Sequence, residues 1–240
     1  MASASTMPAV RYSGPGSLRL ETVATPSVGA GEVLVQVRAA ALCHTELHFI
    51  EGTLNLGVSP ITMGHEAAGV IVSTGAGVGT ERIGERVVVY YYVGCATCRW
   101  CLQGDEQICP SLKAEFGFIS DGGLARYLKA PSRNCVVIPD SLSFELAAPI
   151  GCAVTTAVHA AGLAKPQPRE TAVVYGVNGV GFGLVQLLKH RGLKVSSDVA
   201  YRQRIRLVSQ THTHATRTHS QFFCWIRLVW LGPHPSNPNS

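Results

Sequence analysis

The sequence predicts a mixed fold, with a mostly β N-terminal unit followed by an incomplete α/β unit. Two observations carry this prediction. Up to about residue 140, short segments of alternating apolar and polar residues are separated by glycine-rich turns, a texture typical of β-structure. From residue 143 the chain becomes rich in Ala and Leu, and then shows a buried strand, a glycine turn and a helix. A length of 240 residues suits one large domain or two small ones.

Three segments of the first part are predicted strands. Residues 32–42, EVLVQVRAAAL, alternate apolar and polar side chains as a half-buried strand does. Residues 85–93, ERVVVYYYV, and residues 124–131, LARYLKAP, have the same character. The segment STGAGVG at 73–79 predicts a turn between strands. We therefore expect a compact, mostly β unit that ends near residue 140.

The second part has the periodicity of an α/β unit. Residues 143–164, SFELAAPIGCAVTTAVHAAGLA, predict a short helical start and a longer helix. Residues 171–176, TAVVYG, predict a short buried strand, and residues 179–192 predict a helix that is opened by glycines. The segment LKVSS at 193–197 begins a second predicted strand.

Residues 199–240 differ in composition from the rest of the chain. They hold five of the 20 lysine and arginine residues and no Asp or Glu, so the remaining chain has 15 basic and 15 acidic residues. The formal charge of +5 therefore lies in this segment, and the neutral body argues against nucleic-acid binding. We expect 199–240 to be an atypical basic tail, disordered or non-native in its coding.

The N-terminus and the apolar segments bear on the compartment of the protein. The start MASASTMPAVRY has no apolar core followed by a cleavage site, and no apolar run is long enough to span a membrane. We therefore expect a cytoplasmic protein with no membrane partner. Stable disulfides are disfavoured in that compartment, so we interpret the eight cysteines as metal ligands and buried thiols.

The segment GCATCRWCLQGDEQICP at 94–110 places four cysteines close together: Cys95, Cys98, Cys101 and Cys109. Neighbours this close rarely form good disulfides with each other, whereas such a run can wrap one tetrahedral metal ion. An iron–sulfur cluster is another explanation, because a Cys-x-x-Cys-x-x-Cys run that ends in Cys-Pro is typical of ferredoxins. Here seven residues, not three, precede the last cysteine, which favours a single ion.

Three further segments carry metal-ligand side chains: CHTELH at 43–48, GHE at 64–66 and GCAV around Cys152. Each has an ordinary explanation when it is taken alone. A single cysteine is usually a small buried apolar residue, and a single histidine is usually a hydrogen-bonded one. Only their combination indicates a site.

In this combination and order, the motifs make the chain resemble the zinc-dependent medium-chain alcohol dehydrogenases over roughly residues 7–195. The resemblance is carried by CHTELHFIEG, GHEAAGVIVSTGAGV, GCATCRWCLQGDEQICP, DGGLARY and YGVNGVG. It implies a GroES-like catalytic domain, a partly open β-barrel, in 1–148. It also implies a partial Rossmann dinucleotide-binding domain in 149–198, followed by the tail 199–240.

The resemblance implies two zinc ions. The catalytic zinc would have the ligands Cys43, His65 and Cys152, with Glu66 as a supporting carboxylate and a fourth position open for water or substrate. The structural zinc would have the four ligands Cys95, Cys98, Cys101 and Cys109, which close its coordination sphere. Glu46 stands where the family usually has Asp, and this leaves the geometry of the catalytic site open.

The resemblance also implies roles in proton transfer and cofactor binding. Thr45 would accept the alcohol proton, and His48 would pass it to solvent. The residues implied in binding the cofactor are His44, Thr156, Gly176, Gly179 and Gly181. Asn178 replaces a usual glycine in the turn, and Asp198 is the one candidate for contacting the adenosine ribose. The sequence therefore leaves NAD and NADP open as the cofactor.

The function that follows is an oxidoreductase that transfers hydride between a small alcohol or aldehyde substrate and NAD or NADP, in a family of homo-oligomers. We expect the short nucleotide-binding domain to impair both activity and assembly, because a dinucleotide-binding fold needs about six strands. One alternative is a non-enzymatic zinc-binding fragment. Another is a polyol dehydrogenase, although such enzymes usually have Glu where this chain has Cys152. The run Tyr90–Tyr92 would line the substrate pocket or simply belong to a strand.

Overall fold

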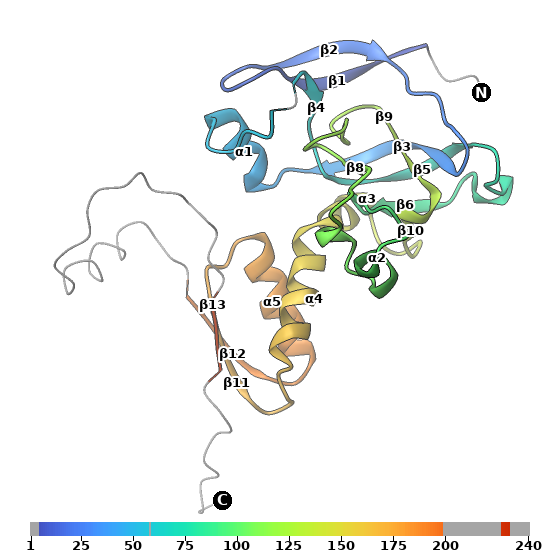
Figure 1. The fold of residues 1–240 in the computed structure, drawn as a ribbon. Coiled ribbons are helices and arrows are strands. Elements are labelled where there is room, and N and C mark those ends of the chain that lie inside the picture. Colours follow the sequence, from blue (N-terminus) through green and yellow to red (C-terminus); the bar gives the residue numbers. More distant parts are fainter. Residues whose placement is uncertain (1–4, 58, 199–226, 231–240) are drawn as a thin grey trace, which may run out of the picture. The chain divides into compact units, whose positions relative to one another are not determined.

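The computed structural model describes residues 5–57, 59–198 and 227–230. The chain divides into two compact units, Met1–Cys152 and Ala153–Ser240 (Figure 1). The mixed fold predicted from the sequence is confirmed. The first unit is mostly β, and the second contains helices and a three-stranded sheet with one parallel and one antiparallel pair of strands. The expected domain limits at 148 and 198 stay predictions.

A five-stranded antiparallel sheet forms the centre of the first unit. Its strands, in spatial order, are β10 (Cys135–Val137), β6 (Arg86–Val89), β5 (Glu66–Thr74), β3 (Glu32–Ala41) and β9 (Tyr127–Pro131). The β3–β5 pair contains two register shifts, and these bend the sheet toward a barrel. The predicted strands at 32–42 and 124–131 correspond to β3 and β9.

Two smaller sheets complete the β-structure of this unit. One has the order β2 (Leu18–Ala24), β1 (Thr6–Tyr12) and β4 (Ile61–Thr62), and the other pairs β7 (Tyr92–Val93) with β8 (Ala114–Glu115). The segment 85–93 is therefore not one strand as predicted. It ends as β6 at Val89 and resumes as β7 at Tyr92, because Tyr90 N–H donates to the carbonyl of Asn134 outside the ladder.

The helices of the first unit are short and lie near the predicted ligands. Its α-helices are α1 (His44–Glu51), α2 (Arg99–Gln103) and α3 (Phe144–Ala147). Its 3-10 helices are η1 (Thr80–Arg82), η2 (Glu106–Ile108), η3 (Ser132–Asn134) and η4 (Ala148–Gly151). The sequence did not predict α1, because its eight residues are too few to show a clear helical period.

The core of the first unit fills the concave side of the five-stranded sheet. Inward-facing aliphatic side chains from three strands meet there, including Val33, Val35, Ile71, Val87 and Val89, each at most 1% exposed. β-Branched residues suit this position because they pack well on a pleated surface.

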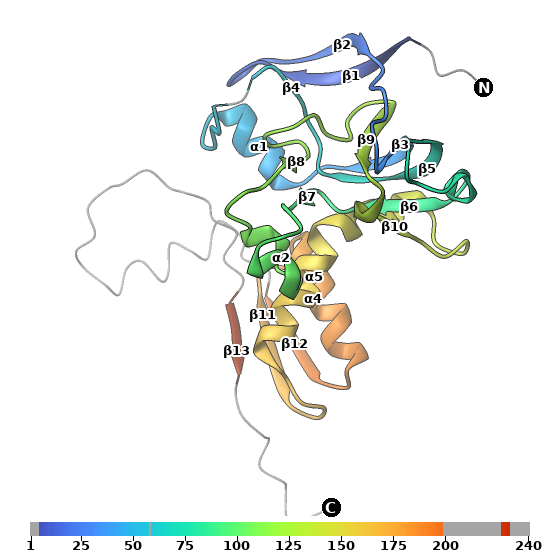
Figure 2. The same ribbon diagram turned by 45° about the vertical axis from the view of Figure 1, so that its right-hand side comes forward.

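The second unit has a β-α-β arrangement preceded by a helix. Its elements are α4 (Ala153–Ala164), β11 (Thr171–Tyr175), α5 (Gly179–His190), β12 (Lys194–Asp198) and β13 (Arg227–Trp230). The strand order is β12–β11–β13, with β12 parallel and β13 antiparallel to β11. Helices α4 and α5 lie side by side (Figure 2). They bury Ala161, Leu184 and Leu188 against Val174.

The sequence correctly predicted the long helix, the buried strand, the glycine-opened helix and the second strand of this unit. Of the expected tail 199–240, the structure describes only Arg227–Trp230, which forms β13. The expectation for the other tail residues lies outside the described residues.

Among the described residues, no single helix has the length and apolar character needed to cross a membrane. One bent pair of consecutive helices, Phe144–Gly151 with Ala153–Ala164, meets those criteria by length and composition only.

Candidate metal centres

The structure brings the first predicted ligand set together. Cys43, His65, Glu66 and Cys152 each offer a ligand atom, and these atoms all lie within 4.8 Å of one another. Cys43 is the N-cap of α1, His65 directly precedes β5, Glu66 is the first residue of β5, and Cys152 is the C-cap of η4. Three segments that are distant in sequence therefore converge on one point of the first unit.

His65 is placed by a crossing of three glycine-containing loops. Gly64 has a φ of +94°, and a Cβ on Gly122 would lie 2.1 Å from the Gly64 carbonyl oxygen. A Cβ on Gly117 would approach the Gly64 backbone to 2.7 Å. Because no side chain fits at these positions, the GHE and DGG motifs pack backbone against backbone. The hydrogen bond from Gly123 N–H to the Gly64 carbonyl, at 2.7 Å, fixes the contact.

Glu46 holds two of the candidate ligand residues at once. Its Oε1 accepts from or shares a proton with His65 Nδ1 at 2.8 Å, and its Oε2 accepts the Cys43 N–H at 2.9 Å. The second bond closes a capping box at the start of α1. The longer side chain of Glu thus reaches both partners, and the geometry of a bound ion at this site stays a prediction.

The donor set fits a metal ion. His65 is 3% exposed, and its Nε2 is buried with no hydrogen-bond partner among the described residues. A buried polar atom without a partner is costly, and a metal bond would satisfy it. Because Glu46 occupies Nδ1, only Nε2 is left to bind a metal, the arrangement usual for histidine ligands. Two thiols and one imidazole suit zinc.

The pKa shifts favour the metal-binding thiolate form of Cys43, whereas those of Cys152 and His65 favour their protonated forms, so that binding a metal would release protons. A hydrogen bond with Cys152, ahead of smaller contributions from His65 and Thr45, lowers the pKa of Cys43 to about 3. The same Cys43 bond, together with burial and a hydrogen bond with Glu66, raises the pKa of Cys152. For His65, burial opposes protonation, but the nearby Cys43 thiolate and the Glu46 carboxylate outweigh it and raise the pKa to about 9.

An aromatic wall encloses His65. Its ring lies 5.0 Å from the ring of Tyr91 and 4.8 Å from that of Phe118, measured between centroids, and these two aromatic rings stack on each other. Burial raises the pKa of Tyr91, so its hydroxyl stays protonated at neutral pH. The sequence singled out Tyr90–Tyr92 but missed Phe118, which no local pattern marks.

The second ligand set also converges. Cys95, Cys98, Cys101 and Cys109 lie in and around α2 and η2, with all four sulfurs within 4.8 Å of one another. The Sγ–Sγ separations include 3.5 Å for Cys98–Cys101, 3.8 Å for Cys98–Cys109 and 3.9 Å for Cys95–Cys101. Two Zn–S bonds of about 2.3 Å at a tetrahedral angle would separate the sulfurs by about 3.8 Å.

These separations decide between the explanations of the cysteine run. A disulfide needs about 2.05 Å between sulfurs, and these cysteines are free. A multi-iron cluster would hold its thiolates farther apart than a single ion does. The spacing therefore fits one tetrahedral ion.

The local backbone is shaped around these sulfurs. Backbone N–H groups of Cys98 and Ser111 point at Cys95 Sγ and Cys109 Sγ, at 3.3 and 3.4 Å. A Cβ on Gly94 would lie 2.5 Å from Cys101 Sγ, so only glycine fits before the first cysteine. A hydrogen bond from the Thr97 hydroxyl lowers the pKa of Cys95 to about 5, which favours its thiolate form.

The residues predicted for proton transfer lie on α1. Thr45 Oγ1 lies 3.5 Å from Cys43 Sγ, beside the first ligand set. The His48 ring bonds to the Thr53 hydroxyl through Nδ1 at 3.1 Å and packs edge-on against the exposed His44 ring at 4.9 Å. The structure thus places Thr45 at the site and His48 one helical turn away, with no direct bond between them among the described contacts.

The predicted cofactor turn lies between β11 and α5. Gly176 has a φ of +85°, and a Cβ on Gly181 would lie 1.9 Å from the Gly176 carbonyl oxygen, so both positions require glycine. Asn178 is the N-cap of α5, and its Oδ1 accepts the Gly181 N–H at 3.1 Å. Thr156 is exposed on α4.

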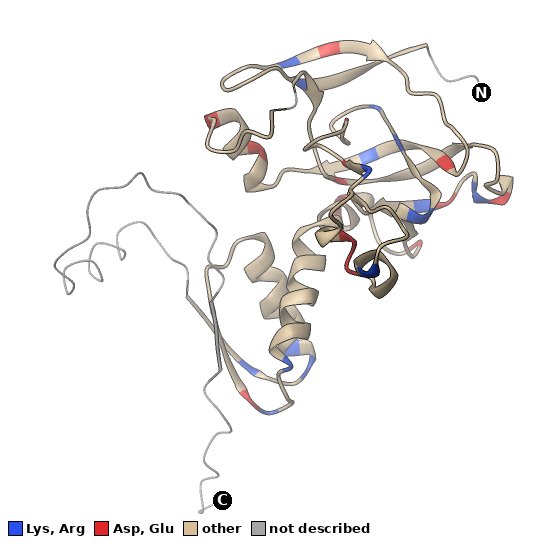
Figure 3. Cartoon of the chain, viewed as in Figure 1, with Lys and Arg blue, Asp and Glu red and all other residues tan. Residues whose placement is uncertain are grey.

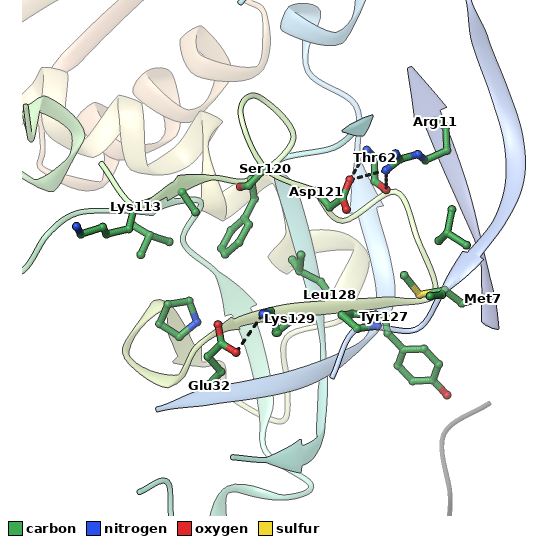
Figure 4. Close-up of a pocket in the computed structure, with 18 residues that line it drawn as sticks. Met7, Arg11, Glu32, Thr62, Lys113, Ser120, Asp121, Tyr127, Leu128 and Lys129 are labelled. Carbon is green, nitrogen blue, oxygen red and sulfur yellow. Dashed lines mark hydrogen bonds and ion pairs between the residues drawn. The ribbon is translucent and has the colours of Figure 1, made fainter. Parts of the chain in front are cut away.

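A cavity of about 620 Å³ lies elsewhere in the first unit, between β1, β2, β9 and the segment 113–122 (Figure 4). Two ion pairs cross its lining, Arg11–Asp121 at 2.5 Å and Lys129–Glu32 at 3.2 Å. None of the candidate metal ligands lines it. It is therefore separate from both ligand clusters.

Comparison with known proteins identifies the relatives of this chain. Residues 29–140 match the model of the alcohol dehydrogenase GroES-like domain. An alcohol dehydrogenase of Geobacillus stearothermophilus is 37% identical over 221 residues, which are 90% of this chain and 65% of that protein. This chain belongs to the zinc-dependent medium-chain alcohol dehydrogenase family.

Two solved structures of the family show the same fold. The alcohol dehydrogenase rspB of Escherichia coli CFT073, solved with NADH, has a TM-score of 0.77 and 31% identity, covering 91% of this chain and 64% of that one. A cobalt- and zinc-bound alcohol dehydrogenase of Pyrobaculum aerophilum has a TM-score of 0.75 and 30% identity, covering 86% and 63%. The chain thus spans less than two thirds of the length of these relatives. Within the family, the first unit is the GroES-like domain and the second is part of a Rossmann-type domain.

Proposed function

We propose that this chain has the function of a zinc-dependent oxidoreductase that transfers hydride between a small alcohol or aldehyde and NAD or NADP. The observation that supports it most is the convergence of Cys43, His65 and Cys152 with a buried, unpartnered His65 Nε2. Two cysteines and one histidine form the ligand set known for alcohol dehydrogenases, and they leave one position for substrate.

The residues of the first cluster would hold the catalytic zinc and shape its surroundings. A bound zinc ion would supply a Lewis acid that polarises the alcohol oxygen and makes its proton easier to remove. Cys43 Sγ, Cys152 Sγ and His65 Nε2 would be the ligand atoms, with Glu46 orienting the imidazole through Nδ1. The rings of Tyr91 and Phe118 border His65 and would limit the access of water.

The proton of the alcohol would leave along α1. Thr45 Oγ1 lies beside Cys43 and would accept this proton while giving up its own. His48, whose imidazole is partly exposed, would pass a proton to solvent, because histidine titrates near neutral pH. The hydride would go to the nicotinamide ring, so the alcohol loses one hydride and one proton, which together are two electrons and two protons.

The second cluster would hold a structural zinc, and the β11–α5 turn would bind the dinucleotide. Four thiolates leave no open position, so this ion would pin the loop 94–111 and do no chemistry. At the turn, Gly176, Gly179 and Gly181 let a backbone approach a pyrophosphate at the N-terminus of α5. His44 and Thr156 are proposed to contact the same cofactor.

The cofactor-binding part is also where we propose that this chain is weak. Its described strands include one parallel pair, β11–β12, where a dinucleotide-binding fold uses about six. We therefore propose slow turnover compared with longer relatives. The neutral composition of residues 1–198 supports the proposal that the protein has no nucleic-acid partner.

The test is NADH or NADPH formation from simple primary and secondary alcohols by the zinc-loaded full chain, with Cys43→Ser as the matched variant. We expect slow turnover that Cys43→Ser abolishes without loss of the circular dichroism signal. A chain that binds two zinc ions but shows no nicotinamide binding by fluorescence titration would instead be a zinc-binding fragment, and this proposal would fail.

A further inference from the structure

The outer edge of β2 is an open strand edge on the first unit. The sheet order β2–β1–β4 places β2 at the margin, and Figure 1 shows it along the rim of that unit. Among the described residues, no strand or loop pairs with this edge. All of β2 except Val23 is exposed, including Leu20 at 76%. An exposed edge of this length readily pairs with another strand.

The hydrogen bonds at both ends of the hairpin show which backbone groups face outward. Ser13 N–H donates to the Ser17 carbonyl at 3.0 Å, and Thr25 N–H donates to the Ser5 carbonyl at 3.0 Å. Hydrogen-bonded pairs alternate along an antiparallel ladder. From the register Tyr12↔Leu18 and Val10↔Leu20, the N–H and C=O groups of Leu18, Leu20 and Thr22 therefore point away from β1.

The side chains on this edge are self-complementary about Leu20. Arg19 and Glu21 flank it, and both are exposed and have no ion-pair partner among the described residues. Figure 3 shows them as one blue and one red position on β2. If two copies of β2 pair antiparallel with Leu20 opposite Leu20, each Arg19 lies opposite the Glu21 of the other copy.

The backbone supports the same register. Leu20 presents both of its backbone groups outward, so the two copies would exchange two hydrogen bonds at the two-fold axis. Leu18 of each copy would exchange two more with Thr22 of the other. Arg19 and Glu21 would then form non-hydrogen-bonded pairs, in which opposite side chains approach most closely.

We propose that β2 is a self-association edge, on which a second copy of this chain adds its own β2 antiparallel with a two-fold axis at Leu20. Charged side chains usually protect a strand edge against pairing, but here the two charges are opposite and lie on either side of Leu20, so a second copy can pair each of them. Such a contact is self-complementary, as a two-fold interface must be. It buries less than the roughly 1,200 Å² of standard interfaces, so the association is weak and reversible.

The decisive experiment is a charge swap, measured by sedimentation velocity on the zinc-loaded full chain over the micromolar range. Arg19→Glu and Glu21→Arg each place like charges opposite one another twice per dimer, and each should weaken self-association about tenfold or more. The double variant R19E/E21R restores opposite charges and should return to within about threefold of the wild type. Lys189→Glu and Glu51→Arg, which change the net charge equally at other exposed sites, should leave association unchanged.

Cross-linking in a lysate tests the same contact without the need for purified, soluble protein. Cα atoms in a hydrogen-bonded pair lie about 5.5 Å apart, within reach of a disulfide. Leu20→Cys should therefore give a disulfide-linked dimer after mild oxidation in a fresh lysate. The wild type and Glu51→Cys, which carry the same native cysteines, should not. Single variants that associate like the wild type, a double variant as weak as the singles, or no cross-link above that of Glu51→Cys would each overturn the proposal.

Discussion

At the scale of single residues, Glu46 controls the geometry of the first metal cluster. Its carboxylate bridges the Cys43 backbone and the His65 ring, and it is 6% exposed. A shorter aspartate at the same position would have to give up one contact or draw α1 closer to β5. The extra methylene thus lets one side chain orient one ligand and anchor the helix that carries another.

We predict that Glu46→Gln weakens zinc binding at the first cluster by about 10- to 100-fold, because partners of metal ligands typically contribute that much. Competition with a chromophoric chelator measures the affinity. Glu46→Asp should fall between Gln and the wild type, since it keeps the charge. Glu51→Gln, an exposed site on the same helix, is the control. Equal affinities for Glu46→Gln and the wild type would show that the bridge is not needed.

A second residue-scale prediction concerns Cys135, which is 4% exposed in the core. Burial raises its pKa from 9.0 to about 12. Between these values the unfolded chain loses the thiol proton and the folded chain keeps it, so stability falls as pH rises above 9. The slope from this one residue approaches about 1.4 kcal/mol per pH unit.

Below pH 9 both states hold the proton, and this residue adds no pH dependence. Cys135→Ala should therefore destabilise the protein at pH 8 through the lost packing, yet lose less stability than the wild type between pH 9 and 10. Urea unfolding at the three pH values gives both quantities. Parallel pH curves for the two proteins would contradict the assignment.

At the scale of secondary-structure elements, β13 covers an edge that would otherwise be open. β11 pairs with β12 on one side, and residues Ala172–Tyr175 pair with β13 on the other. A parallel sheet with a free central edge invites association with other chains. β13 therefore protects the edge of β11, although the sequence around β13 shows neither a helical nor a strand periodicity.

We predict that removing residues 227–240 increases aggregation, because it exposes the edge of β11. Removing only residues 231–240 keeps β13 and serves as the matched control. Static light scattering during mild heating compares the two deletions with the full chain. If both deletions aggregate equally, β13 does not protect the edge.

At the scale of the whole molecule, two separate ligand clusters predict two zinc ions, and the loss of each ion should affect the protein differently. The cysteine cluster shapes the loop 94–111, and the other cluster lies beside the aromatic wall. We expect elemental analysis to find up to two zinc ions per folded chain. Cys98→Ser should lose one ion and much of the thermal stability, whereas Cys43→Ser should lose the other ion and keep most of the fold.

The Cys98→Ser and Cys43→Ser variants also test whether the two clusters are independent zinc sites. Loss of the same single ion in both would show that the clusters are not independent sites. Iron in the purified protein, or a cluster band in its visible spectrum, would remove the zinc assignment of the cysteine cluster.

The sequence by itself determined the elements whose patterns are local. The alternation in 32–41, the glycine-opened helix at 179–190 and the buried strand at 171–175 are properties of neighbouring residues, and periodicity detects them. The four clustered cysteines are likewise local, since the closing of one loop brings their sulfurs together.

Only the tertiary structure decided the features that depend on segments distant in sequence. The reach of Glu46 to His65, the backbone crossing at Gly64 and Gly122, and the packing of Phe118 on Tyr91 join residues from different strands and loops. The free edge of β2 depends on strand order, and the pairing of β13 with β11 joins segments far apart in the chain. A sequence pattern records what each residue prefers locally, whereas these contacts are fixed by the burial and hydrogen bonding of the folded chain.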